Sequence, residues 1–162
     1  PMFFSLSDQK DAKAKYANMM LYYVVFACIS ALVIFLGLDL FKYFISSAYW
    51  EGLKIVPILL IAYLMLGVYY NLSVWYKVID KTQYAIIISL VGAFFTIIVN
   101  VLFIPKFGYM ACAYAALLSY SSMVISSYFM MRKYYKINYN LKLILPLILV
   151  VAFILIFFNW HI

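Results

Sequence analysis

Charged residues are scarce in this sequence. They make up 10% of the 162 residues, whereas 70% are hydrophobic and the mean hydropathy is +1.06. A water-soluble domain of this length would have too few polar side chains to cover its surface. The composition therefore excludes an ordinary soluble domain and indicates a protein whose solvent is the lipid bilayer.

Histidine and cysteine, which commonly bind metal ions, are almost absent. The only histidine is His161, and the two cysteines, Cys28 and Cys112, lie in separate hydrophobic stretches. Neither cysteine has metal-ligand spacing to a partner, so the sequence predicts no disulfide, no metal site and no cofactor. Both cysteines are interpreted as small packing residues within the membrane.

Carboxylates are also few. Asp39, Glu51 and Asp80 stand at the ends of hydrophobic stretches, and Asp8 and Asp11 lie before the first one. Proton relays in membranes normally need a buried carboxylate, so any coupling residue is expected elsewhere in a larger protein. The sequence also lacks a nucleophile with its base and a glycine-rich phosphate loop, and the protein is not expected to be an enzyme.

Long apolar stretches are abundant, and about 20 apolar residues suffice for a helix to cross a bilayer. They do not alternate apolar and polar residues as barrel strands do, and backbone groups in lipid must be paired within the segment. The predicted fold class is therefore an all-α polytopic membrane helix bundle with about five transmembrane helices. The predicted spans cover about residues 19–41, 55–76, 84–104, 108–131 and 143–158. The last is the most uniformly apolar and is expected to be peripheral and lipid-facing.

The net charge of +7 comes from basic residues at the ends of these stretches. If successive spans alternate in direction, nine basic residues fall on one side and three on the other, which indicates that the first side is cytoplasmic. The nine are Lys10, Lys13, Lys15, Lys77, Lys81, Arg132, Lys133, Lys136 and Lys142, and the three are Lys42, Lys54 and Lys106. The charge is thus interpreted as topology, with no nucleic-acid partner. A specific anionic-lipid site in the 132–142 loop is an alternative to simple anchoring.

The segment NVLFIPKFGYMACAYAALLSY, from Asn100 to Tyr120, is apolar, breaks, and then resumes with small residues. Pro105 cannot continue a helix with full hydrogen bonding, and Gly108 permits a tight turn. The sequence therefore predicts a short external turn at residues 105–108 that joins two antiparallel spans.

Small residues after this turn recur every four positions, in two neighbouring rows. Such small-xxx-small patterns let helix backbones approach closely in lipid, where hydrophobic burial between helices contributes little. The span is therefore predicted to be a packing helix against the preceding span or another helix. The predicted packing residues are Gly108, Cys112 and Ala116 in one row and Ala111, Ala115 and Ser119 in the other.

Polar residues inside the spans are the candidates for a transport site. Gly92, Thr96 and Asn100 share one face of the third span, and Asn71 in the second span is a further candidate. They are interpreted either as residues that line a cavity or as a hydrogen-bonded seam between helices, and the seam is the favoured reading.

The segment from Asn100 to Tyr120 resembles the helix–turn–helix signature of polysaccharide biosynthesis proteins in the multidrug/oligosaccharidyl-lipid/polysaccharide flippase superfamily. In that signature a span ending in Asn, three apolar residues and Ile-Pro meets a Gly and then a run of Gly and Ala. The matching residues are Asn100, Ile104, Pro105, Gly108, Ala113 and Ala115. Ala111 and Cys112 stand where the family usually has Gly and Ala, and both remain small.

The resemblance implies the C-terminal part of a bacterial inner-membrane transporter of about 12–14 helices in two halves. Residues 1–162 would form most of the second half, and the N-terminal half of the same protein would be its partner. The implied activity is translocation of undecaprenyl-linked oligosaccharide for surface polysaccharide such as O-antigen, capsule or exopolysaccharide. Cationic residues that meet the lipid diphosphate are expected mainly in the first half.

Two other functions remain open. A multidrug or metabolite cation antiporter of the same superfamily would need an acidic residue inside a first-half span. A membrane glycan polymerase or ligase would need a large periplasmic loop with Arg and His, whereas the longest external connection, roughly residues 42–54, contains neither.

Overall fold

The computed structural model describes the backbone of residues 10–159 and the side chains of residues 12–157; Asp8 and His161 lie outside this range. Every regular element in the described chain is a helix, so the predicted all-α fold class is confirmed. The elements are α2 (Lys10–Leu36), α3 (Leu38–Phe41), the 3-10 helix η1 (Ser47–Ile55), α4 (Val56–Leu72), α5 (Val74–Val78), α6 (Gln83–Phe107), α7 (Tyr109–Tyr134) and α8 (Leu141–Asn159).

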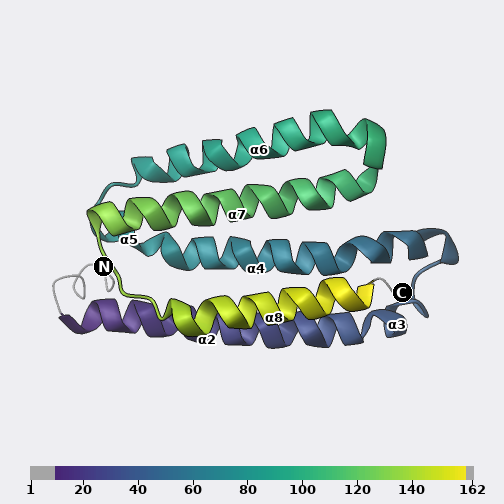
Figure 1. Cartoon of the computed structure of the whole chain (residues 1–162), viewed down its shortest axis with the longest axis horizontal. Helices are drawn as coiled ribbons and strands as arrows, with labels where there is room; N and C mark the ends of the chain where they lie inside the picture. The colour runs from purple at the N-terminus through teal and green to yellow at the C-terminus, as the bar shows by residue number, and fades with distance from the viewer. Residues whose placement is uncertain (1–9, 160–162) are drawn as a thin grey trace.

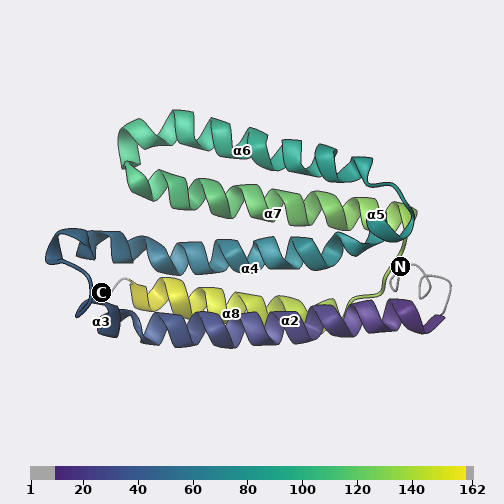
Figure 2. The ribbon, with the colours of Figure 1, turned by 180° about the vertical axis from the view of Figure 1, so that it is seen from behind.

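The long helices lie side by side, and consecutive ones run in opposite directions (Figure 1). Across the bundle the order is α6, α7, α4 and then α2, with α8 beside α2 and α4 (Figure 2). Helix α7 is thus the central element, because it packs extensively against α6 on one side and α4 on the other.

Four helical segments are long and apolar enough to cross a membrane: Ala12–Leu36, Ser47–Val78, Gln83–Phe107 and Tyr109–Tyr134. The fifth predicted span corresponds to α8, whose apolar part is shorter. At 1.5 Å per residue its 19 residues extend about 28 Å, close to the hydrocarbon thickness of about 30 Å.

The charged segment was expected to be a short surface helix that runs into the first span, from about residue 19, and α2 joins the two in one helix from Lys10 onward, because no helix-breaking residue separates them. One predicted boundary differs from the structure. Helix α6 continues through Pro105 to Phe107, so the turn lies at Gly108 alone, where φ is +56°. Pro105 stands in the last turn, where the missing N–H removes only one hydrogen bond.

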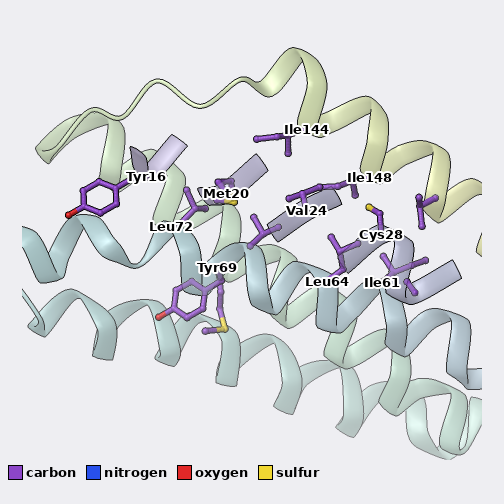
Figure 3. Packing of buried hydrophobic residues seen from close by; sticks show 14 of the residues in the cluster. Tyr16, Met20, Val24, Cys28, Ile61, Leu64, Tyr69, Leu72, Ile144 and Ile148 are labelled. Carbon is purple, nitrogen blue, oxygen red and sulfur yellow. The ribbon is translucent and has the colours of Figure 1, made fainter. Parts of the chain in front are cut away.

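The main hydrophobic cluster joins α2, α4 and α8. A row of α2 residues spaced by four, Tyr16, Met20, Val24 and Cys28, is buried along this contact (Figure 3). Residues of the facing helices in the same cluster are Ile61, Leu64, Tyr69 and Leu72 of α4 and Ile144 and Ile148 of α8.

The outside of the bundle carries many large apolar side chains. Phe26, Leu36, Phe94 and Phe153 are each at least 60% exposed, and they belong to three different long helices. A water-soluble monomer rarely shows such a continuous apolar surface. This apolar surface and the lengths of the helices indicate a membrane-embedded protein.

Helix α8 is less peripheral than predicted. It buries Ile144, Ile148, Val151 and Leu155 on the side toward α2 and α4 and exposes its other side. The outermost helix is α6, which packs mainly against α7 and buries only three residues. Uniform apolarity did not distinguish the two because both the interior and the surrounding lipid accept apolar side chains.

Candidate functional site

The contact between α6 and α7 is built around Gly92. A Cβ at this position would lie 2.6 Å from Sδ of Met123 and 3.0 Å from Oγ of Ser119, so the glycine allows the two helices to approach. The Ser119 hydroxyl donates a hydrogen bond of 2.8 Å to the Gly92 carbonyl across this contact. One interhelical hydrogen bond of the expected seam is therefore present.

The two predicted rows of small residues on α7 differ in burial. Ala111, Ala115 and Ser119 are buried, and Ala113 between them is also buried. Gly108 and Cys112 are exposed and Ala116 is half-buried, so within this chain these three do not form the main contact. In this chain Gly108 forms the turn and Cys112 points outward, so a packing role for these two residues stays a prediction.

Trp75 connects α5 to α7 at one end of the bundle. Its indole is fully buried, and Nε1 donates a hydrogen bond of 3.1 Å to Oγ of the equally buried Ser127. The ring stacks on Tyr134 with a centroid separation of 6.0 Å and an interplanar angle of 8°. Tyr84, at the start of α6, contacts both rings, so this aromatic cluster joins α5, α6 and α7.

Basic residues surround the same end. The ammonium groups of Lys81 and Lys133 lie 5.1 and 5.4 Å from the centroid of the Tyr134 ring. Lys13 of α2 lies 4.5 Å from the centroid of Tyr135. The fold thus brings together basic residues that the sequence analysis assigned to one side. Lys and aromatic rings in combination are typical of a membrane–water interface.

This end of the bundle is predicted to face the cytoplasm. In a Cys112→Ser background, cysteines introduced at Thr82 and Asn138 should resist an impermeant thiol reagent applied from the periplasm. A cysteine at Phe107, in the last turn of α6 at the opposite end, should be labelled. The measurement is the labelled fraction in intact cells compared with lysed cells, and the reverse pattern would invert the topology.

Asn71 and Thr96 bind the backbone of their own helices. The Asn71 amide donates a 3.0 Å hydrogen bond to the Gly67 carbonyl, and the Thr96 hydroxyl donates one of 3.0 Å to the Gly92 carbonyl. Asn71 lies near the basic end of α4 and Asn100 near the opposite end of α6, with α7 between these helices. The structure therefore does not bring Asn71 together with Thr96 and Asn100.

Among the predicted site residues, Asn100 has a side-chain oxygen that accepts no hydrogen bond from the described residues. Its side chain is half-buried, and its Oδ1 is buried without a hydrogen-bond partner among the described residues. A buried polar atom without a partner is unfavourable unless another group reaches it. The cavity-lining role of Asn100, Thr96 and Asn71 stays a prediction.

Two of the cavities between the described helices are lined by apolar atoms. The larger one has a volume of about 410 Å³ and is lined by residues of α7, α8, α4 and α2. The smaller one has a volume of about 280 Å³ and lies beside the turn between α6 and α7. None of the three predicted polar residues lines either cavity.

Three residues important for this arrangement were not predicted. Ser127 could have been found by extending the row Ala111–Ala115–Ser119 by two further steps of four residues. Gly67, which contacts Tyr23 of α2, and Tyr139, which lines the larger cavity, had no comparable signal. A lone glycine in a span and a tyrosine in a tyrosine-rich loop have many possible roles.

In the range that the structure describes, no three His, Cys, Asp or Glu side chains come together as a metal site would require. Comparison with known proteins adds no family to this description: no family model, no curated protein and no solved structure matches the chain.

Proposed function

We propose that this chain is part of a transporter that moves undecaprenyl-linked oligosaccharide from the cytoplasmic to the periplasmic leaflet of the bacterial inner membrane. The chain would supply one half of the carrier, and an N-terminal half of the same protein would supply the other. The transported unit would be a precursor of a surface polysaccharide.

The observation that carries this proposal is the hairpin formed by α6, Gly108 and α7. This hairpin contains the segment Asn100–Tyr120 that resembles the flippase signature. Its geometry gives a physical reason for two parts of the resemblance: a glycine at positive φ for the turn, and small residues where α7 meets its neighbours.

The polar residues support a role as one wall of a shared path. Asn100 has a buried Oδ1 without a partner among the described residues, and an amide at such a position can bind sugar hydroxyls or a polar group of a second half. A lipid diphosphate needs basic partners as well, and the basic residues of this chain stand at the ends of its helices. We therefore assign the diphosphate to the other half.

Complementation of a strain that lacks its own flippase tests this function. The protein comprising both halves should restore surface glycan with its cognate sugar pathway. Asn100→Ala should reduce export by about fivefold, the equivalent of one hydrogen bond of about 1 kcal/mol. Asn138→Ala, in the exposed loop between α7 and α8, is the matched control and should export normally.

Two results would contradict the proposal. Restoration of surface glycan by residues 1–162 alone would show that no second half is needed. Failure of the complete protein to restore glycan, combined with efflux of cationic drugs, would assign the protein to the antiporter alternative.

A further inference from the structure

The larger cavity is a groove that opens on the surface of the bundle. One wall is formed by Ile125 and Phe129 of α7, and the other by Leu145 and Leu149 of α8. These four side chains are 53–65% exposed, so the groove opens to the surroundings. Its volume of about 410 Å³ is bounded by apolar atoms only, and in a membrane such a groove must be filled by an apolar chain.

Each wall of the groove carries a basic residue at the same end. Arg132 stands one turn beyond Tyr128 and Phe129 on α7, and its guanidinium carbon lies 5.9 Å from the centroid of the Tyr128 ring, which lines the groove. Lys142 precedes Leu145 by three positions and Leu149 by seven, so it shares their face of α8. Among the described side chains, no carboxylate forms a salt bridge with Arg132 or Lys142.

Tyr139 lies between these two basic residues in sequence and lines the same groove through the carbon atoms of its side chain, with its hydroxyl buried beside the groove. Oη of Tyr139 is buried and has no hydrogen-bond partner among the described residues. Burial raises the pKa of this phenol well above its ordinary value, so it keeps its proton and remains a donor at physiological pH. A buried donor without a partner is unfavourable unless a ligand supplies an acceptor.

We infer that this groove is a binding site for one anionic glycerophospholipid of the cytoplasmic leaflet. One acyl chain lies between α7 and α8, and the phosphate is held by Arg132 and Lys142. The Tyr139 hydroxyl donates to a phosphate or ester oxygen of the same lipid. The combination of an apolar groove, two basic residues at one end and an unpaired donor favours a lipid with a net negative headgroup over a zwitterionic one. This site is independent of the proposed transport function.

The test measures which lipids stay bound to the intact protein. The protein is purified in detergent, equilibrated with an equimolar mixture of phosphatidylglycerol and phosphatidylcholine of identical chains, and analysed by native mass spectrometry. Phosphatidylglycerol should dominate the one-lipid complex. Arg132→Gln and Lys142→Gln should each reduce this preference by about fivefold. Lys77→Gln, an exposed lysine of α5 at the same end of the bundle, is the matched control and should leave it unchanged.

A second measurement locates the lipid without relying on variants. Phosphatidylglycerol with a diazirine in one acyl chain is photo-crosslinked to the unmodified protein, and the adducts are mapped by peptide sequencing. Adducts should concentrate on residues 124–129 and 144–149 and be rare on the exposed face of α6. Tyr139→Phe should weaken retention of phosphatidylglycerol without moving the adducts.

Any of three outcomes would overturn the site. These are no preference for phosphatidylglycerol, an equal loss in Lys77→Gln, and adducts spread evenly over the exposed helices. The second would indicate a diffuse surface charge effect, and the third would show that the groove does not hold the lipid. None of these results depends on whether the protein exports glycan.

Discussion

Replacing Trp75 by alanine should lower the free energy of unfolding by about 3–5 kcal/mol, the cost typical of removing a large buried aromatic side chain. The indole is fully buried between α5 and α7, and it packs on Tyr134, Tyr84 and Tyr76. Its removal leaves a cavity at the contact between α5 and α7. It also leaves the buried Ser127 hydroxyl without the indole N–H that it accepts.

The free energy of unfolding can be measured by titration with sodium dodecyl sulfate and far-ultraviolet circular dichroism. Trp50→Ala is the control, because Trp50 is 45% exposed in η1 and should contribute less than about 1 kcal/mol. Ser127→Ala should cost about 1–3 kcal/mol, since it leaves the buried indole N–H unpaired. Equal small losses for Trp75→Ala and Trp50→Ala would mean that the aromatic cluster does not support the contact between α5 and α7.

The class of the fold could be predicted because it depends on a simple requirement. A segment must be about 20 apolar residues long to cross a bilayer and must pair its own backbone groups, and both conditions are visible in the sequence. The ends were less accurate. Pro105 was expected to end the third span, but it removes only one hydrogen bond in the last turn and α6 continues to Phe107.

The direction in which each helix faces could not be predicted. On α2 the buried residues Met20 and Val24 differ little in character from the exposed residues Phe26 and Val33. In water this difference in environment would appear as a polar and an apolar face, but in lipid both faces are apolar and the periodic signal vanishes. The two rows of small residues on α7 were equivalent for the same reason, and only packing against α6 and α4 distinguishes Ala111 from Cys112.

The candidate polar site was predicted only in part. Residue type and spacing placed Thr96 and Asn100 on one face of α6, but they could not show that Thr96 binds its own backbone. Nor could they show that α7 separates Asn71 from Asn100, because this depends on the order of helices across the bundle. The sequence predicted that the basic residues at this end lie on one side of the membrane. It could not predict the groove that begins there, because the groove depends on how α7 and α8 are placed relative to each other.

Gly67→Leu should separate α2 from α4 and lower the free energy of unfolding by about 3 kcal/mol, the upper end of the range for overpacking. Tyr23 of α2 packs directly on this glycine. A Cβ at position 67 would lie 2.9 Å from Cε1 of the Tyr23 ring and closer still to its Cζ and Oη. A leucine would therefore occupy the space of the ring, and neither helix can move without disturbing the buried row on α2.

A compensating change can show whether Gly67→Leu destabilises the protein because of Tyr23 or because position 67 tolerates no side chain at all. Tyr23→Ala makes room for the new side chain, so Gly67→Leu should cost much less in the double variant, with a coupling of about 0.5–3 kcal/mol. Gly52→Leu is the matched control, because no atom lies within 4 Å of a Cβ at that position. Tyr22→Ala, at a neighbouring side chain that is 71% exposed, should give no rescue. If Gly67→Leu remained equally damaging beside Tyr23→Ala, the close approach of Tyr23 would not be the reason for a glycine at this position.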